Sequence, residues 1–153
     1  LDSTVEPTGF ATRLAEDLDA VPYASGAVLA SDTATTADFE RMESVAGGLG
    51  ERGLYLLDLL PVHRGVALQV AQRQGLRAAS CAASIDAAAT AEQRERALLR
   101  ARNLAVARGG ALLVVEPDDG GLTWLEPFID ARVAEGYRLV FASELLDSIP
   151  SSP

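Results

Sequence analysis

The feature that most constrains the fold is the alternation of short apolar runs with longer helical patterns along the chain. The apolar runs are expected to form strands at Gly26 to Ala30, Gly53 to Leu59, Arg77 to Ile85, Gly110 to Val115 and Tyr137 to Ala142. Between these runs, apolar residues recur every three or four positions, which is typical of helices. The expected helices cover Ala11 to Ala20, Ala37 to Glu51, Gly65 to Gln74, Ala91 to Ala107 and Leu122 to Glu135.

This order of elements predicts an α/β fold with a parallel sheet, either covered by helices on both faces or wrapped into a barrel. In both arrangements the functional residues gather at the carboxyl ends of the strands. The best-marked helix begins at Ala91, because Thr90 and Gln93 have the spacing of a capping box and Gly109 suits the helix end. The length suits one domain, expected over residues 1–149, followed by a tail at 150–153.

Composition argues against several classes of partner. The 153-residue chain has 13 basic and 22 acidic residues, and its formal net charge is -9. This charge repels phosphate backbones, so nucleic acid is not expected to bind. The apolar runs are far shorter than the roughly 18 residues of a membrane span, so none is expected in this chain. The one cysteine, Cys81, has no partner for an internal disulfide and is interpreted as a small core residue.

Carboxylates near the ends of the expected strands are the candidate binding residues. They are Asp32, Asp58, Asp86 and Glu116. A rim of carboxylates binds a cation or a polyhydroxylated ligand, and two at a suitable spacing perform glycosidic acid/base chemistry. The alternative is that each acid caps the helix that follows it. Trp124, near the loop after Glu116, is either a sugar-stacking aromatic or a core residue.

Two further motifs are interpreted as structural. The run from Gly48 to Gly53, "GLGERG", matches a dinucleotide fingerprint. That fingerprint needs a strand before it and a helix after it, and the order here is reversed, so it marks a helix exit. His63 is the only histidine, which is too few for an ordinary zinc site, and we expect it in the loop after the second strand.

Several segments, taken in order, resemble the divergent polysaccharide deacetylase family over nearly the whole chain. They include "GAVLASDTATT" at Gly26 to Thr36, "GLRAASCAASID" at Gly75 to Asp86, "ALLVVEP" at Ala111 to Pro117 and "EGYRLVFASELL" at Glu135 to Leu146. The resemblance implies an incomplete (β/α) barrel, a divalent metal such as zinc, and a periplasmic or cell-envelope location. It also implies strands upstream of Leu1, the last ending in an Asp-Asp pair, and we expect the chain to be cut from something longer.

The chain departs from the family at the positions that would hold the metal. Ala30 and Glu116 stand where the family has histidines, whereas Asp86 keeps the motif aspartate. Since imidazoles normally hold the ion that activates water, we expect a catalytically degenerate domain with no metal or other cofactor and no catalytic residue. It would bind a glycan or an envelope protein.

Two alternatives stay open at this point. One is an active carbohydrate esterase or hydrolase with a rearranged acidic site built from Asp32, Asp86 and Glu116. The other is a small cytosolic α/β domain whose resemblance to the family is fortuitous. The sequence specifies neither the ligand, nor the partner, nor the oligomeric state.

Overall fold

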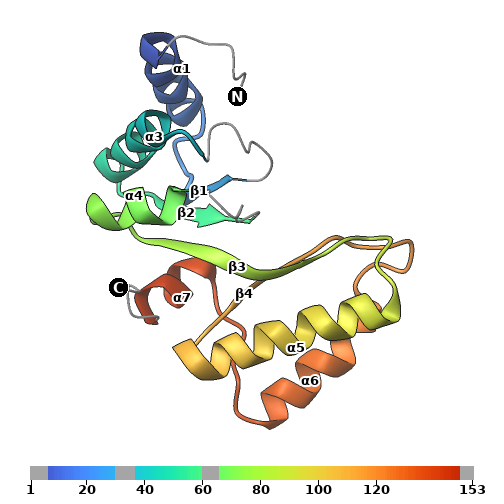
Figure 1. The fold of residues 1–153 in the computed structure, drawn as a ribbon. Helices are drawn as coiled ribbons and strands as arrows, with labels where there is room; N and C mark the ends of the chain where they lie inside the picture. The colour runs from blue at the N-terminus through green and yellow to red at the C-terminus, as the bar shows by residue number, and fades with distance from the viewer. Residues whose placement is uncertain (1–6, 30–36, 60–65, 149–153) are drawn as a thin grey trace. The chain divides into compact units, whose positions relative to one another are not determined.

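The strands and helices alternate along the chain as the sequence predicts (Figure 1). The computed structural model describes residues 7–29, 37–59 and 66–148. Its strands form one sheet in the order β1 (Gly26–Leu29), β2 (Tyr55–Asp58), β3 (Ala78–Ile85) and β4 (Leu112–Val115). Its helices are α1 (Pro7–Asp19), α3 (Phe39–Glu51), α4 (Ala67–Arg73), α5 (Ala91–Arg108), α6 (Glu126–Ala134) and α7 (Ala142–Ser148), with a 3-10 turn, η1 (Thr123–Leu125), ahead of α6.

The sheet is parallel and open, which confirms the α/β class and is consistent with an incomplete barrel. Strand order follows chain order because each strand is followed by a helix that returns the chain to the same end of the sheet. In the register, Leu29 lies opposite Asp58, and Asp58 lies opposite Ser80. Asp58 is therefore at the carboxyl edge, where the sequence predicts functional residues.

The first compact unit ends at Cys81 and contains a packed apolar core. Helices α1, α3 and α4 lie in a row beside β1 and β2 (Figure 1). The core cluster consists of Phe10, Leu14, Met42, Val45, Ala46, Leu49, Leu54, Leu56, Ala67, Val70 and Ala71. The four core residues of α3 follow helical spacing, so that one face of this helix is buried. Asp38 caps α3 by accepting a hydrogen bond from the Arg41 backbone N–H at 3.1 Å.

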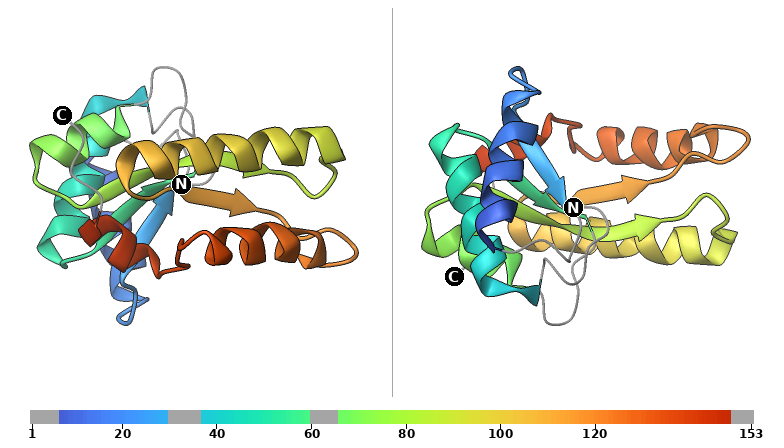
Figure 2. Two further views of the ribbon diagram at one scale, coloured as in Figure 1. Left: turned by 90° about the horizontal axis from the view of Figure 1, so that it is seen from below. Right: turned by 90° about the horizontal axis from the view of Figure 1, so that it is seen from above.

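The second compact unit begins at Ala82, and its longest helix is α5. The predicted capping box is present: the Gln93 backbone N–H donates to Thr90 Oγ1 at 3.3 Å, and the Thr90 N–H donates to Gln93 Oε1 at 2.7 Å. Gly109 ends the helix in the left-handed conformation, with φ at 82°. Helices α5 and α6 run alongside each other, and both start from the same end (Figure 2). Ala101 is the one buried residue of α5, and α6 has none.

The prediction of a fifth strand at Tyr137 to Ala142 is wrong. After Gly136, with φ at 94°, residues 137–141 form neither a strand nor a helix, and α7 then begins at Ala142. Leu139 and Phe141 are 75% and 78% exposed. An apolar run becomes a strand only where a neighbouring strand supplies hydrogen-bond partners, and the described part of the chain offers none here.

None of the described helices has the length and the hydropathy that a membrane span requires.

Candidate functional site

The carboxyl ends of β3 and β4 are neighbours in the second unit. The backbone N–H of Glu116 donates to the Ile85 carbonyl at 2.9 Å, so Asp86 and Glu116 follow adjacent strands as predicted. Both side chains are exposed. Asp86 Oδ1 accepts a hydrogen bond from the Ala88 N–H at 2.7 Å, a local bond typical of a turn. Asp86 therefore stabilises the loop that leads into α5.

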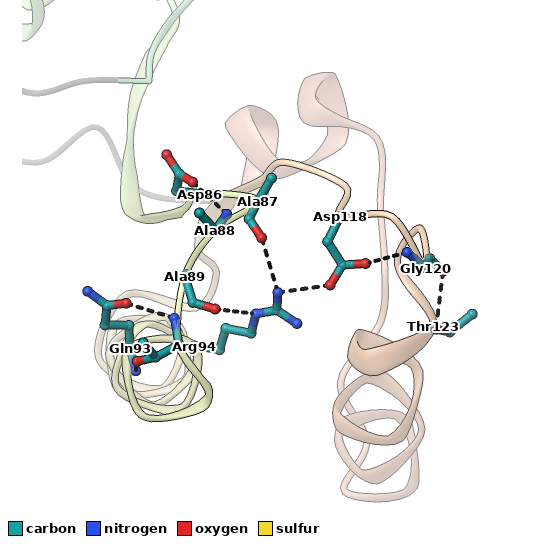
Figure 3. Close-up of polar contacts among 10 residues, drawn as sticks. Asp86, Ala87, Ala88, Ala89, Gln93, Arg94, Asp118, Gly120 and Thr123 are labelled. Atoms are coloured by element: carbon teal, nitrogen blue, oxygen red, sulfur yellow. Dashed lines mark hydrogen bonds and ion pairs between the residues drawn. The ribbon is translucent and has the colours of Figure 1, made fainter.

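Arg94, in the first turns of α5, joins the loop after β3 to the loop after β4 (Figure 3). Its Nε donates to the Ala89 carbonyl at 3.0 Å, and its Nη2 donates to the Ala87 carbonyl at 3.3 Å. The same Nη2 makes an ion pair with Asp118 Oδ2 at 2.8 Å. The pair is mostly buried, at 19% and 26% side-chain exposure, so it is less screened than a surface ion pair. The two loops are thereby held together by one guanidinium.

Asp118 also shapes its own loop. Its second oxygen accepts a hydrogen bond from the Gly120 N–H at 2.9 Å (Figure 3). The backbones of Asp118 and Gly121 bond to each other, and Gly121 takes the left-handed conformation with φ at 75°. The run from Asp118 to Gly121 is thus a tight turn that presents one carboxylate to Arg94. Sequence reasoning missed both residues, although an Asp-x-Gly turn and an arginine early in a helix were visible signals.

Trp124 lies in an open groove of about 680 Å3 between α5 and α6. The Arg94 guanidinium stacks over the indole ring at 4.3 Å from its centroid. The ring is half-buried, and its buried Nε1–H has no hydrogen-bond acceptor among the described residues. Trp124 therefore lines a groove that is open to solvent and that contains none of the candidate carboxylates Asp58, Asp86 and Glu116.

Asp58 and Cys81 belong to the first unit. Asp58 is 4% exposed at the end of β2. Cys81, in β3, is buried as predicted, and its thiol donates to the Leu59 carbonyl at 2.7 Å. Burial raises the pKa of the Cys81 thiol above its ordinary value of 9.0, and the nearby charge of Asp58 raises it further. The cysteine is thus a neutral thiol at neutral pH and not an activated nucleophile.

The remaining candidates bear on the metal that the family resemblance implies. Asp32 and His63 lie outside the described residues. Within residues 7–29, 37–59 and 66–148, no three His, Cys, Asp or Glu side chains lie close enough together to hold a metal ion. The two exposed carboxylates at the ends of β3 and β4 therefore have no third ligand in that part of the chain. Two carboxylates by themselves are not the ligand set of an ordinary zinc centre.

Comparison with protein families gives a match that extends over nearly all of the chain. The family model described as divergent polysaccharide deacetylase matches residues 1–146. No curated protein matches the chain. The matched region includes all four strands of the sheet and both carboxylates at the ends of β3 and β4. The chain belongs to the divergent polysaccharide deacetylase family.

Proposed function

We propose that this chain is a catalytically degenerate member of its family that acts by binding a glycan in the cell envelope. The observation that carries the proposal is Glu116, an exposed carboxylate at the position where the resemblance calls for the second motif histidine. At the position of the first motif histidine the chain has Ala30. Carboxylates alone favour hard ions such as Mg²⁺ and Ca²⁺, whereas a deacetylase of this kind relies on imidazole-held zinc to activate water.

The surroundings of the two carboxylates support the same proposal. Asp86, the retained motif acid, accepts a hydrogen bond from the loop backbone, and Glu116 faces solvent. Efficient hydrolysis takes place in sites that exclude bulk solvent, apart from the reacting water, and that hold charged groups with fixed dipoles. Exposed side chains after β3 and β4 lack that enclosure.

One observation favours the alternative, an active esterase or hydrolase with a rearranged acidic site. Asp86 and Glu116 follow adjacent strands, so both carboxylates are at one edge of the sheet. Such an enzyme would use them with a hard cation or as an acid and base pair. The alternative predicts hydrolysis that depends on Glu116.

The test is release of acetate from acetylated chito-oligosaccharides by the intact chain, with and without added Zn²⁺ or Mg²⁺. We expect no rate above that of buffer under any of these conditions. The control for Glu116→Ala is Asp119→Ala, because Asp119 is an exposed carboxylate in the following loop. An acetate-release rate that is lost in Glu116→Ala and kept in Asp119→Ala would establish the esterase instead.

Family membership also supports a periplasmic or envelope location for the protein. Fractionation of cells that produce it is the direct check. Recovery in the cytosolic fraction would favour the small cytosolic domain over the envelope module.

A further inference from the structure

The groove of the second unit has two parallel helical walls that are joined at both ends. Near the start of α5, Arg94 stacks on Trp124 at 4.3 Å. Further along α5, Arg102 pairs with Glu135, which follows α6, at 3.8 Å. Arg94 and Arg102 are about 12 Å apart along the helix axis. The groove therefore has room for a ligand of more than one small ring.

The far end of the groove has more positive than negative charge. Arg102 and Arg132 share one carboxylate, Glu135, at 3.8 and 2.6 Å. Among the described residues, these two guanidiniums pair with this one carboxylate, which leaves the cluster with one net positive charge; Glu95, a carboxylate in the lining of the groove, is nearer the Arg94 end. Although the whole chain is acidic, with a net charge of -9, this cluster favours an anion.

Three residues that line the same groove each carry a buried N–H group without an acceptor among the described residues. In the part of the chain that the structure describes, these atoms are Arg102 Nε, Arg132 Nε and Trp124 Nε1. The side chains of Arg102 and Arg132 are themselves 40% and 21% exposed, so a ligand in the groove meets their outer guanidinium N–H groups rather than the buried Nε atoms. A ligand that fits must therefore bring several acceptor oxygens, at least one of them charged.

The groove also has apolar and aromatic surface beside these donors. Phe128 lies under the Arg132 guanidinium at 5.2 Å from its ring centroid, and Leu98 completes the wall on α5. A pyranose ring combines an apolar C–H face with oxygens around its rim, which matches aromatic surface next to N–H donors. Both walls are helices, whose backbone groups are already bonded, so there is no strand edge for an extended peptide to join.

We propose that the α5–α6 groove binds an acidic saccharide, with a sugar carboxylate on Arg102 and Arg132 and a ring against Trp124 and Phe128. The proposal rests on the proposed glycan-binding function and names the class of its ligand. The guanidinium fork matches a carboxylate in geometry as well as in charge.

The test uses Trp124 as its reporter, because it is the only tryptophan of the chain. The intact protein is titrated with a short unacetylated oligouronate and with its methyl ester, which keeps the rings and removes the charge. The indole N–H signal of Trp124 in the 15N NMR spectrum is followed together with its fluorescence. We expect the acid to shift the indole signal saturably and the ester to bind at least about tenfold more weakly.

Variants locate the carboxylate. Arg102→Met and Arg132→Met should each weaken oligouronate binding about tenfold, because each removes a charged donor and keeps most of the aliphatic stem. Arg100→Met is the matched control, since Arg100 is exposed on α5 outside the groove, and it should leave the affinity unchanged. Thermal unfolding of each variant shows that it is folded. If Arg102→Met or Arg132→Met does not fold, the proposal is tested by the acid and ester titrations of the unaltered chain.

Four results would overturn the proposal: no saturable shift with the oligouronate, equal affinity for acid and ester, unchanged affinity in both groove variants, or tighter binding of hexaglutamate than of the oligouronate. The last would assign the groove to an acidic peptide. Acetate release from acetylated sugars would instead contradict the proposed function, and it would leave the groove result intact because the oligouronate has no acetyl group.

Discussion

Helix α3 of the first unit is buried along one face, whereas the more polar helix α5 of the second unit is left largely exposed. Helix α3 buries Met42, Val45, Ala46 and Leu49, whereas α5, although longer, buries only Ala101. The first unit has a continuous apolar core, while the loops of the second are joined through polar contacts such as those of Arg94. The difference indicates that the first unit supplies most of the folding free energy, and the second is the unit to which we assign the proposed ligand groove.

Core truncation should show the largest contrast between the units. Leu49→Ala removes a fully buried side chain from the core cluster, and we expect it to lower the free energy of unfolding by about 3 kcal/mol. Leu99→Ala, at a position that is 50% exposed on α5, should cost less than about 1 kcal/mol. Denaturant unfolding followed by circular dichroism measures both, and equal losses would remove the contrast.

Loss of the Arg94 guanidinium should have the next largest effect, and it should act on the second unit. Arg94→Met removes the pair with Asp118, two bonds to loop carbonyls and the contact with Trp124. We expect the free energy of unfolding to fall by about 2 kcal/mol, because the hydrogen bonds involve a charged group and are partly buried. Hydrogen exchange should become faster in the loops before α5 and η1 and stay unchanged in α3. The control, Arg96→Met, removes an exposed pair with Glu92 and a long hydrogen bond to the Glu92 carbonyl, and an equal change there would contradict the role of Arg94.

The capping box of α5 should contribute less to the free energy of unfolding than Arg94 does. Thr90→Ala removes the acceptor for the Gln93 N–H at the start of α5, and we expect a loss of about 1 kcal/mol. Thr90→Ser keeps a hydroxyl at this position and should retain most of the stability. The same unfolding measurement compares the two variants, and equal stability of the serine and alanine forms would show that the cap is dispensable.

The smallest effect on stability is expected from ionisation of the Cys81 thiol, and it appears only at high pH. Burial, and then the charge of Asp58, raise the pKa of its thiol above 9.0 in the folded chain. Above pH 9 the unfolded chain loses this proton while the folded chain keeps it, so stability falls as pH rises through the folded pKa. Below pH 9 the contribution is fully present. Unfolding measured on both sides of pH 9 should show a steeper fall for the unaltered chain than for Cys81→Ala, and identical slopes would contradict the shift.

Local signals in the sequence predict most of the fold. Helix α5 was placed correctly because Thr90, Gln93 and Gly109 mark its ends by chemistry that needs no distant partner. The run at Tyr137 to Ala142 has the same apolar pattern as the true strands and yet is not one. Whether such a run forms a strand depends on whether a neighbouring strand pairs with it, and the local pattern does not encode this.

The candidate site divides in the same way. Asp86 and Glu116 could be placed at one edge because parallel strands end together. The contact of Arg94 with Asp118 joins residues far apart in the chain. Arg102 and Arg132 share Glu135, and their Nε atoms have no acceptor among the described residues, because of how α5 and α6 lie together. Such features arise from tertiary packing, so no spacing in the sequence reveals them.

The most direct test of the central claim, that this family member binds and does not hydrolyse, is a calorimetric titration of the intact chain with Zn²⁺. We predict no saturable heat at micromolar zinc, because Ala30 and Glu116 replace the imidazoles that would hold the ion. Saturable micromolar binding that is weakened by Glu116→Ala and unchanged by Asp119→Ala would contradict the account.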